Sequence, residues 1–588
     1  MNGRVNAACA IAITVAVSSF GAVAQNTDNR TIKISPELRL TTTVGNRAFS
    51  QVIGEKITVV AFIAVNCPIA NSYAPDYATL QRDLKRQGGN LVLVYSNAGD
   101  ISEAAEHVRQ YGLSDCMVVL DQDQVVASAF HASMTPEMYV VKDYQVVYQG
   151  RLDDRYLGRT RPTGSTARTS ELRNAVSAVL SGREVKLAKT KVFGCAIERT
   201  LPNGQKGPTY YPQVKNVLER SCVRCHDASG VAPMTFATYA GARRYANNIA
   251  SVVAQRQMPP WKADKSSHTY ANLRSISEVD RKVLMQWAAT GAASGTQTVV
   301  SPTRDDRPVV KWDTELTASA MHTVKASGPD EYRTFIIPTD FKEDKWIDAI
   351  DFRPSNAKVV HRILGFVDAS RGARKHVDGL ASLGYSNFGG LLSPPDADLG
   401  AWFPGNPLQV LRDGAAWKLP KGADILVQVH YHPTGKVEVD APTVRMRFAG
   451  GTVSHERQLL TLGRGDLYLP AGAIKPISVT HRVEQAISIH SIMPHMHFAG
   501  KSIKVTVTTP DGNVTPLLGI RDWDIYWQEA YLFEKPVDVP IGSVITVNAV
   551  YDNSIANPRQ PNVPPKDIHS GETNKDEKLL VYVGYTAK

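Results

Sequence analysis

The spacing of apolar residues changes twice along the chain, and this change constrains the fold more than any single motif does. The first part alternates short apolar runs with amphipathic stretches, and the middle part has a helical pattern. Beyond about Pro302, short alternating runs are separated by Gly and Pro turns. Because one hydrophobic core cannot hold 588 residues, the sequence predicts a multidomain protein in which each part has its own class of secondary structure.

The first residues predict export. Arg4 gives a weakly positive start, an apolar run follows at 7–17, and Ala22-Val23-Ala24 has the small residues of a cleavage site. We therefore expect a signal peptide at 1–24 and a periplasmic or secreted product; a retained, uncleaved anchor is the alternative. No later apolar run reaches the length of about 18 residues that a bilayer requires, so no membrane span is expected after signal cleavage.

Charge and cysteine content each exclude one possibility. The net charge of +10 is spread along the chain and forms no basic runs, so no nucleic-acid role is expected. Cys9 lies in the expected signal peptide, and no cysteine occurs after Cys225. The last part of the chain must therefore be stabilised by packed sheets, since it cannot form internal disulfides even in an oxidising compartment.

The first part of the chain predicts an α/β domain. We expect strands at 56–65, 91–95 and 117–120, helices at 69–87 and 101–111, and a closing hairpin at 138–141 and 145–148. Cys67-Pro68 falls where the first of these strands meets the first helix. A thiolate at a helix N-terminus is stabilised by unpaired amides and by the helix dipole. Cys67 is therefore a candidate catalytic nucleophile.

The segment 65–70 around Cys67, with Thr135-Pro136-Glu137 later in the chain, resembles the redoxin branch of the thioredoxin-like family. The resemblance implies a thioredoxin-like domain at 26–184. The family's second active-site cysteine falls on Ala70, so the usual local two-thiol exchange is lost. Cys116 or Cys195 could resolve a disulfide instead, and a redox-inert scaffold with a leftover cysteine is the alternative.

The middle part contains the motif Cys222-Val223-Arg224-Cys225-His226. Two thiols at this spacing can form thioethers to a haem, and the histidine that follows can supply one axial ligand. The opposite ligand is expected at Met258, with Met234 as the second choice. Zinc binding or a disulfide at the two cysteines remains an alternative, as does a simple helix stop at the Met-Pro-Pro sequence.

With Met258-Pro259-Pro260-Trp261 and an expected helix at 277–290, this part resembles cytochrome c-like modules. The resemblance implies a small α-helical module at 190–300 that carries covalent haem c. The pattern is interrupted at 162–165, and a linker is expected at 187–208, where it changes again.

The last part predicts two β-sandwiches, at 305–449 and 450–588, that meet near Ala449-Gly450-Gly451. No long helix is expected there. The runs expected to form strands include 333–337, 424–432, 443–448, 485–490 and 502–508.

Histidines occupy alternate positions in this β-rich part: His430 with His432, and His495 with His497. Because successive side chains of a strand point to opposite faces, each pair places two imidazoles on one face. Copper or zinc requires such nitrogen donors, so the sequence predicts redox-metal sites in this part of the chain.

Residues 330–588 resemble the copper type II, ascorbate-dependent monooxygenases of the dopamine β-hydroxylase and peptidylglycine hydroxylating types. The segments 359–361, 427–432 and 494–501 occur in the family's order, with Trp523-Asp524 and 551–553 downstream. The resemblance implies two jelly-roll-like domains, each with one copper, that face one another across a solvent cleft.

The resemblance implies a first copper at His361 and His430. The family has a second histidine where this chain has Arg362, and an arginine cannot bind a metal, so two imidazoles remain unless His432 completes the site.

The second copper is implied at His495 and His497. Lys578 replaces the family's methionine, and Met493 or Met496 could supply a sulfur ligand from nearby.

Together, these features predict an exported copper-dependent oxidoreductase of monooxygenase type, with up to two copper ions and haem c. The resemblance implies that the second copper activates dioxygen, the first relays an electron, and a C–H bond of a small-molecule or peptide substrate becomes C–OH. The haem would replace ascorbate as electron donor. The alternative is a non-catalytic haem and copper protein for electron transfer or metal handling, which Arg362 and Lys578 favour. Isolated histidines such as His455 and His569 are expected to be structural.

Overall fold

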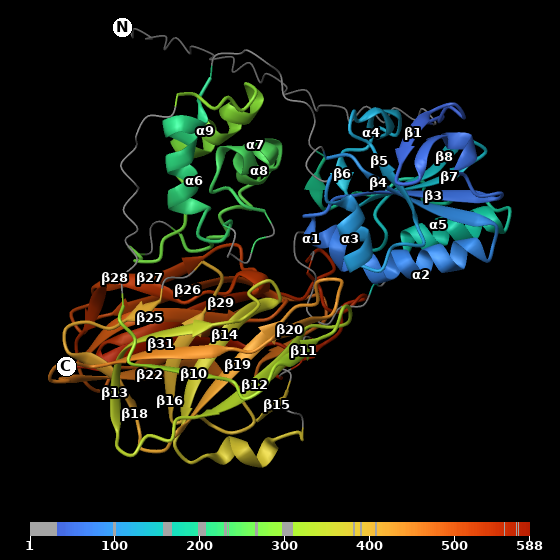
Figure 1. Ribbon diagram of the computed structural model, residues 1–588. Helices are drawn as coiled ribbons and strands as arrows, with labels where there is room; N and C mark the ends of the chain where they lie inside the picture. The colour runs from blue at the N-terminus through green and yellow to red at the C-terminus, as the bar shows by residue number, and fades with distance from the viewer. Residues whose placement is uncertain are drawn as a thin grey trace, which may run out of the picture.

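The computed structural model describes residues 32–588 except 98–100, 157–166, 168, 198–206, 228–231, 233, 265–267, 297–309, 380–382, 388–390, 406–407, 558, 572 and 574. The expected signal peptide and the expected interruption at 162–165 lie outside the described residues. Figure 1 shows an α/β module in blue, a helical module in green, and a β-rich part from yellow to red. Within the described residues, no helix has both the length and the apolar character needed to cross a membrane.

The α/β module is built on a seven-stranded sheet of order β2-β1-β5-β4-β3-β7-β8, in which β3, β4 and β5 are parallel and β7–β8 is the expected hairpin. This is a thioredoxin-like topology, as predicted. The strands are β1 (Arg39–Thr42), β2 (Gly45–Ala48), β3 (Ile57–Ile63), β4 (Gly89–Tyr95), β5 (Met117–Leu120), β6 (Met134–Thr135), β7 (Glu137–Lys142), β8 (Gln145–Gly150) and β9 (Cys195–Ala196). The helices are α1 (Pro68–Ser72), α2 (Ala74–Lys85), α3 (Ala104–Gln110), α4 (Val125–Ala129) and α5 (Glu171–Leu180), with a 3-10 turn η1 (Phe49–Gln51).

The single helix expected at 69–87 is wrong in one respect, because the structure divides it into α1 and α2 at Tyr73. Pro75 has no N–H to donate and occupies the first turn of α2, where that loss costs nothing. A new helix therefore begins there, and α1 remains a separate short element next to Cys67.

The middle part contains the helical turn η3 (Tyr210–Val214) and the helices α6 (Lys215–Ser221), α7 (Tyr239–Arg244), α8 (Ala246–Ala254) and α9 (Glu278–Ala289). They pack around the fully buried Trp287. The helix expected at 277–290 is confirmed: Ser277 caps α9 by accepting from the amide of Asp280, whose carboxylate accepts from Ser277 in return.

The β-rich part consists of packed sheets, and its described residues form only short 3-10 turns, η4 (Gly372–His376) and η5 (Ile525–Trp527), as helical elements. In the first half, the strands are β10 (Thr314–Thr317), β11 (His322–Val324), β12 (Glu331–Pro338), β13 (Lys345–Arg353), β14 (Val360–Asp368), β15 (Gly384–Ser386), β16 (Ala397–Trp402), β17 (Gln409–Val410), β18 (Ala415–Leu419), β19 (Asp424–Tyr431), β20 (Glu438–Asp440) and β21 (Thr443–Phe448). In the second half, they are β22 (His455–Arg464), β23 (Tyr468–Leu469), β24 (Ile474–Arg482), β25 (Ile487–Met496), β26 (Gly500–Thr508), β27 (Val514–Ile520), β28 (Tyr531–Val539), β29 (Val544–Asp552), β30 (Ile568–His569) and β31 (Leu579–Ala587).

Each half has its own core between two sheets. In the first half, the five-stranded sheet β15-β12-β19-β14-β16 faces strands β10, β21, β13 and β18. In the second half, the four-stranded sheet β24-β29-β26-β27 faces β22, β31, β25 and β28. The two halves also share one continuous sheet, because β18 and β22 pair in parallel at Ala415–His455 and Ala416–Glu456. This pairing was not expected from the sequence.

Arg274, between α8 and α9, joins the helical module to both β-sandwiches. It donates to the Pro404 carbonyl at 2.8 Å, after β16 of the first sandwich. It also forms a buried ion pair with Glu529, before β28 of the second sandwich. One guanidinium therefore holds three modules together.

The α/β module contacts the helical module and the first sandwich. Asn66 Nδ2 donates to the Tyr245 hydroxyl at 3.1 Å. In the loop after β19, Gly435 lies so close to the Asn71 carbonyl that a side chain at 435 would collide with it, and the Lys436 ammonium lies 5.7 Å from the centre of the Tyr111 ring. The module therefore lies against the segment that follows His432.

Candidate metal and thiol sites

The structure brings His361 and His430 together on neighbouring strands β14 and β19. Their ring centroids are 4.8 Å apart and the rings are inclined at 65°. The strand register advances from Val360–Tyr431 to Arg362–His430, so His361 is the extra residue of a β-bulge. The bulge turns the His361 side chain toward His430, a feature that no sequence pattern indicated.

Asp330, which sequence reasoning missed, holds the first histidine group in place. Its carboxylate bonds to Nε2 of His430 and to Nδ1 of His432, both at 2.8 Å. Burial opposes ionisation of Asp330, but its electrostatic attraction to His432 and His430 and the hydrogen bonds from both rings hold its pKa far below the ordinary value. Because a carboxylate accepts, the Nε2 of His430 carries the proton, and its buried Nδ1 keeps a lone pair with no hydrogen-bond partner among the described residues. A histidine oriented by a carboxylate in this way is a suitable metal ligand.

His432 faces Asp330 through its Nδ1, and whether it completes the first group stays a prediction. Arg362, the residue that replaces the family's histidine, lies 5.9 Å from the centre of the Tyr332 ring, which stacks on His430 at 4.2 Å. Burial, the neighbouring His430 and the Arg362 charge together lower the pKa of His361 to about 3. Both imidazoles of the pair are therefore neutral at neutral pH, which metal binding requires.

The structure also brings His495 and His497 together at the end of β25, with ring centroids 5.1 Å apart. Nδ1 of His495 lies 2.5 Å from Oε1 of Gln528, and Nδ1 of His497 lies 3.0 Å from the Asp576 carbonyl. Because the Gln528 oxygen is an acceptor, the proton of His495 resides on Nδ1 and the lone pair on Nε2. Two imidazoles on the same side of one strand can share a metal ion.

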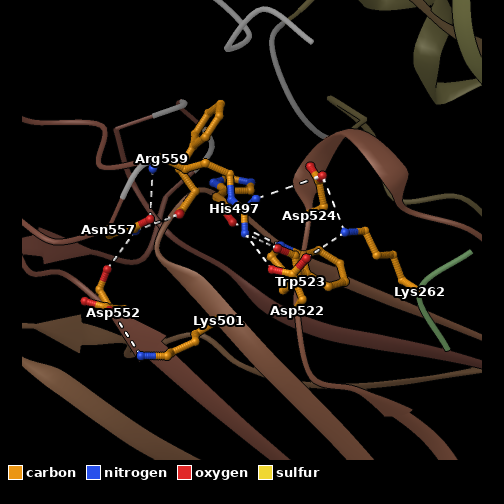
Figure 2. Close-up of polar contacts among 10 residues, drawn as sticks. Lys262, His497, Lys501, Asp522, Trp523, Asp524, Asp552, Asn557 and Arg559 are labelled. Atoms are coloured by element: carbon orange, nitrogen blue, oxygen red, sulfur yellow. Dashed lines mark hydrogen bonds and ion pairs between the residues drawn. The ribbon is translucent and has the colours of Figure 1, made fainter. Parts of the chain in front are cut away.

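A buried carboxylate and a tryptophan hold the backbone of His497. Glu577 accepts from the amides of His497, Ala499 and Lys578. The Trp523 indole donates to the His497 carbonyl at 3.1 Å, as Figure 2 shows. A side chain at Gly500 would place its Cβ only 2.7 Å from Trp523, so the turn requires glycine there.

Of the three residues considered as a further ligand for His495 and His497, Met496 is excluded by its position. It is fully buried in the core of the second sandwich, on the face opposite to His495. Met493 lies on the same face as His495 and lines a pocket between the sandwiches. Lys578 lies close enough for its charge to lower the pKa of His495, together with burial, His497 and Arg362.

Across the described residues, no three His, Cys, Asp or Glu side chains are placed to hold one metal ion. Each histidine group thus offers two imidazoles. Arg362 lies close to both groups, because its charge lowers the pKa of His361, His430 and His495.

A pocket lies between the two sandwiches. Its walls are mostly apolar and include Leu364, Phe366, Leu459, Met493 and Leu532. Two opposite charges also line it: the buried Arg457, whose pKa burial lowers, and Asp398, whose pKa burial raises. Gly584 makes room for Arg457, since a side chain at 584 would collide with the guanidinium. The pocket was not expected from any sequence motif.

The Cys222-Val223-Arg224-Cys225-His226 motif follows the C-terminal end of α6. Cys222 and Cys225 are both unlinked, and burial raises the pKa of Cys222 to about 12. Nδ1 of His226 lies 3.1 Å from the Met234 carbonyl, which orients the ring. These residues fit covalent haem: two separate thiols and one oriented imidazole.

The two candidate methionines of this module lie in different surroundings. Met234 packs against the core of the helical module. Met258 leads through two prolines into Trp261, which packs on Tyr531 of the second sandwich with ring centroids 5.1 Å apart. The Met258 segment therefore connects the helical module to the second sandwich, and the choice of Met258 as haem ligand stays a prediction.

Cys67 caps the N-terminus of α1, as predicted. Its buried Sγ accepts from the Ala70 amide at 3.4 Å and donates to the Thr135 carbonyl at 3.0 Å. Burial opposes ionisation, but hydrogen bonds from Cys195 and Ala70 lower the pKa of Cys67 to about 7. Of the two cysteines considered as its partner, the structure therefore places Cys195 beside it.

Cys116 lies at the opposite end of the sheet. Cys67 follows the end of β3, whereas Cys116 precedes the start of β5, and the two strands run in parallel with β4 between them. Burial also raises the pKa of Cys116 to about 12, so it is a structural thiol.

No protein-family model matches the chain, and the comparison with curated proteins gives no match. Among solved structures, an uncharacterized conserved protein from Geobacillus kaustophilus is 27% identical, with 29% of this chain and 92% of that chain covered and a TM-score of 0.25. A hypothetical protein from Sinorhizobium meliloti is also 27% identical, with coverages of 29% and 98% and a TM-score of 0.25. A secreted disulfide oxidoreductase from Mycobacterium tuberculosis is 17% identical, with coverages of 25% and 96% and a TM-score of 0.19.

Proposed function

We propose that the chain is an exported copper-dependent oxidoreductase of monooxygenase type that receives electrons through a covalent haem. The observation that carries the proposal is the His495–His497 pair, in which two imidazoles lie 5.1 Å apart between ring centroids and each Nδ1 faces a protein acceptor. A bound copper ion would supply one-electron chemistry with dioxygen at this position.

The residues around each pair support a role in holding a metal. Gln528 and the Asp576 carbonyl orient the two rings of the second group, and Glu577 fixes the backbone of His497. Asp330 orients His430 in the first group, opposite His361. The His361–His430 pair would hold the first copper ion, which would supply a site for electron relay.

The pocket between the sandwiches supports a place for the substrate. It reaches Met493, two residues before His495 on the same face of β25. Its apolar walls would exclude water, while Arg457 and Asp398 would orient the polar groups of a small molecule or peptide.

Cys222 and Cys225 would form the thioethers to the haem, and His226 would bind its iron. The motif is close to both sandwiches. A side chain at Gly405, beside Pro404 in the first sandwich, would collide with the Cys225 sulfur. Arg274 joins this region to Glu529 of the second sandwich. The haem would therefore lie at the junction of the two sandwiches and supply electrons there.

A test is to express the chain with copper and haem supplied, then measure copper per chain and dioxygen consumption under reducing conditions. His495→Ala should lower copper affinity by at least about 100-fold and should abolish dioxygen uptake. Loss of a residue that only orients a metal ligand costs up to about 100-fold in affinity, and loss of the ligand itself should cost no less. His569→Ala, at an exposed histidine, is the control. Stoichiometric haem without any copper in the unaltered chain would contradict the proposal.

A second candidate is a non-catalytic haem and copper protein that transfers electrons or handles metal. Two-imidazole groups beside the cations Arg362 and Lys578 favour it. This second function would be supported if the chain binds copper but consumes no dioxygen with any of the substrates and electron donors supplied.

A further inference from the structure

Cys195 reaches Cys67 through a short strand pair that covers the α1 end of the α/β module. β9 pairs antiparallel with β6, which sets Cys195 opposite Thr135. The Thr135 carbonyl accepts from the Cys67 thiol at 3.0 Å, and the Thr135 hydroxyl donates to the Cys195 carbonyl at 3.3 Å. One threonine therefore contacts both cysteines.

Two further features keep the cysteines close. A side chain at Gly194 would collide with the Thr135 carbonyl, so glycine is needed for β9 to approach β6. The thiol and the amide of Cys195 both hydrogen-bond to the Cys67 sulfur. The missing second cysteine at Ala70 is thus replaced in space by Cys195, far along the chain.

We propose that Cys67 and Cys195 form a reversible disulfide that exchanges electrons with an external disulfide or dithiol, and that exchange begins at Cys195. Cys67 has no exposed surface, whereas Cys195 is partly exposed. The accessible sulfur must therefore meet the partner first, and the buried sulfur resolves the product.

With a partner disulfide, the exchange takes two steps in which atoms and electrons balance. The Cys195 thiolate attacks one partner sulfur, a mixed disulfide forms, and the partner's other sulfur leaves as a thiolate. The Cys67 thiolate then attacks the Cys195 sulfur, and the first partner sulfur leaves. The two cysteines lose two electrons and two protons, and the partner becomes a dithiol.

The pair lies at the boundary with the helical module. Asn66, next to Cys67, donates to Tyr245, and Ala196, next to Cys195, donates from its amide to Asn248 Oδ1 at 2.6 Å. Tyr245 contacts Phe236, which stacks on His226 at 4.3 Å between ring centroids. Exchange at Cys195 would thus occur beside the module that carries the haem motif.

The test uses the full chain with its haem, equilibrated with mixtures of reduced and oxidised glutathione. Free thiols are alkylated, and peptides are mapped by mass spectrometry without reduction. We expect a peptide linked through Cys67 and Cys195 that disappears with reductant and is absent in Cys67→Ser and Cys195→Ser. Cys116→Ser is the matched control and should retain the link.

Cys67→Ser should also accumulate a glutathione adduct on Cys195, because the resolving sulfur is lost, whereas Cys195→Ser should leave the buried Cys67 unmodified. Thermal unfolding of each variant checks that it is folded. The proposal is overturned if Cys67 and Cys195 are both recovered as free thiols in the oxidised folded chain, or if Cys67 is linked to Cys116.

Discussion

At the scale of single residues, the two histidine groups differ in what surrounds them. Asp330 connects His430 to His432 in the first group, whereas neutral acceptors hold His495 and His497 in the second. Burial lowers the pKa of His430, the Asp330 carboxylate opposes that shift, and the Arg362 charge adds to it. If the first group binds copper as proposed, the nearby Arg362 charge would favour the cuprous ion, whose charge is lower.

Lys578→Met tests whether position 578 lies at the ligand position of the second group. A thioether is a soft donor that favours the cuprous ion, and the substitution also removes a positive charge near His495. Cu(I) affinity should rise on the order of tenfold, which corresponds to about 1.4 kcal/mol. Competition with a chromogenic Cu(I) chelator measures it, and Lys504→Met, at an exposed position of β26, is the control. Equal affinity in all three proteins would place residue 578 outside the site.

At the scale of elements, the β25–β26 turn depends on the buried Glu577 from the segment before β31. Burial raises the pKa of Glu577 to about 8, although amide hydrogen bonds favour the ionised form. Between the ordinary value of 4.5 and about 8, the folded chain therefore holds a proton that the unfolded chain has lost. This group makes the fold less stable as pH rises through that interval.

We expect the contribution of Glu577 to the free energy of unfolding of the metal-free protein, taken as the difference between the native chain and Glu577→Gln, to fall between pH 5 and pH 8 by at most about 1.4 kcal/mol per pH unit. The glutamine of Glu577→Gln cannot ionise, so the pH dependence due to Glu577 should be absent from the unfolding free energy of this variant. Altered hydrogen bonds to the backbone amides should lower its stability by the same amount at every pH. Urea unfolding at several pH values measures both profiles, and Glu534→Gln, at an exposed position of β28, should retain the slope. Parallel profiles for the native chain and Glu577→Gln would contradict the assignment.

Much of this element structure is predictable from the sequence, because it follows from local periodicity. The strand expected at 443–448 is β21 residue for residue, and His430 and His495 lie on strands as their alternation indicated. The bulge at His361 and the pairing of Cys195 with Thr135 depend on contacts between distant segments, so no local pattern reveals them. Asp330 is equally invisible, since an isolated aspartate before a strand resembles any turn residue.

At the scale of the whole molecule, Arg274 is the residue on which the most modules depend. Its ion pair with Glu529 is buried, so removal of the guanidinium leaves a buried carboxylate without its partner charge. Arg274→Met should therefore destabilise the assembly by about 3–5 kcal/mol.

Differential scanning calorimetry checks this prediction, with an earlier transition expected for the helical module. Arg256→Met is the matched control, because Arg256 pairs with Glu278 at 2.9 Å on the surface, where a salt bridge contributes about 0–1 kcal/mol. Similar losses in the two variants would mean that Arg274 does not join the modules.

The parallel pairing of β18 with β22 has a consequence for turnover. A hinge at Ala449–Gly451 could open only if the hydrogen bonds at Ala415 and Ala416 broke, so the two sandwiches move as one body. In the proposed enzyme, the distance that an electron would cross between His430 and His495 is then set once, when the chain folds. The rate of that transfer would depend on the driving force and on this constant separation, and tethering the two halves more tightly would leave it unchanged.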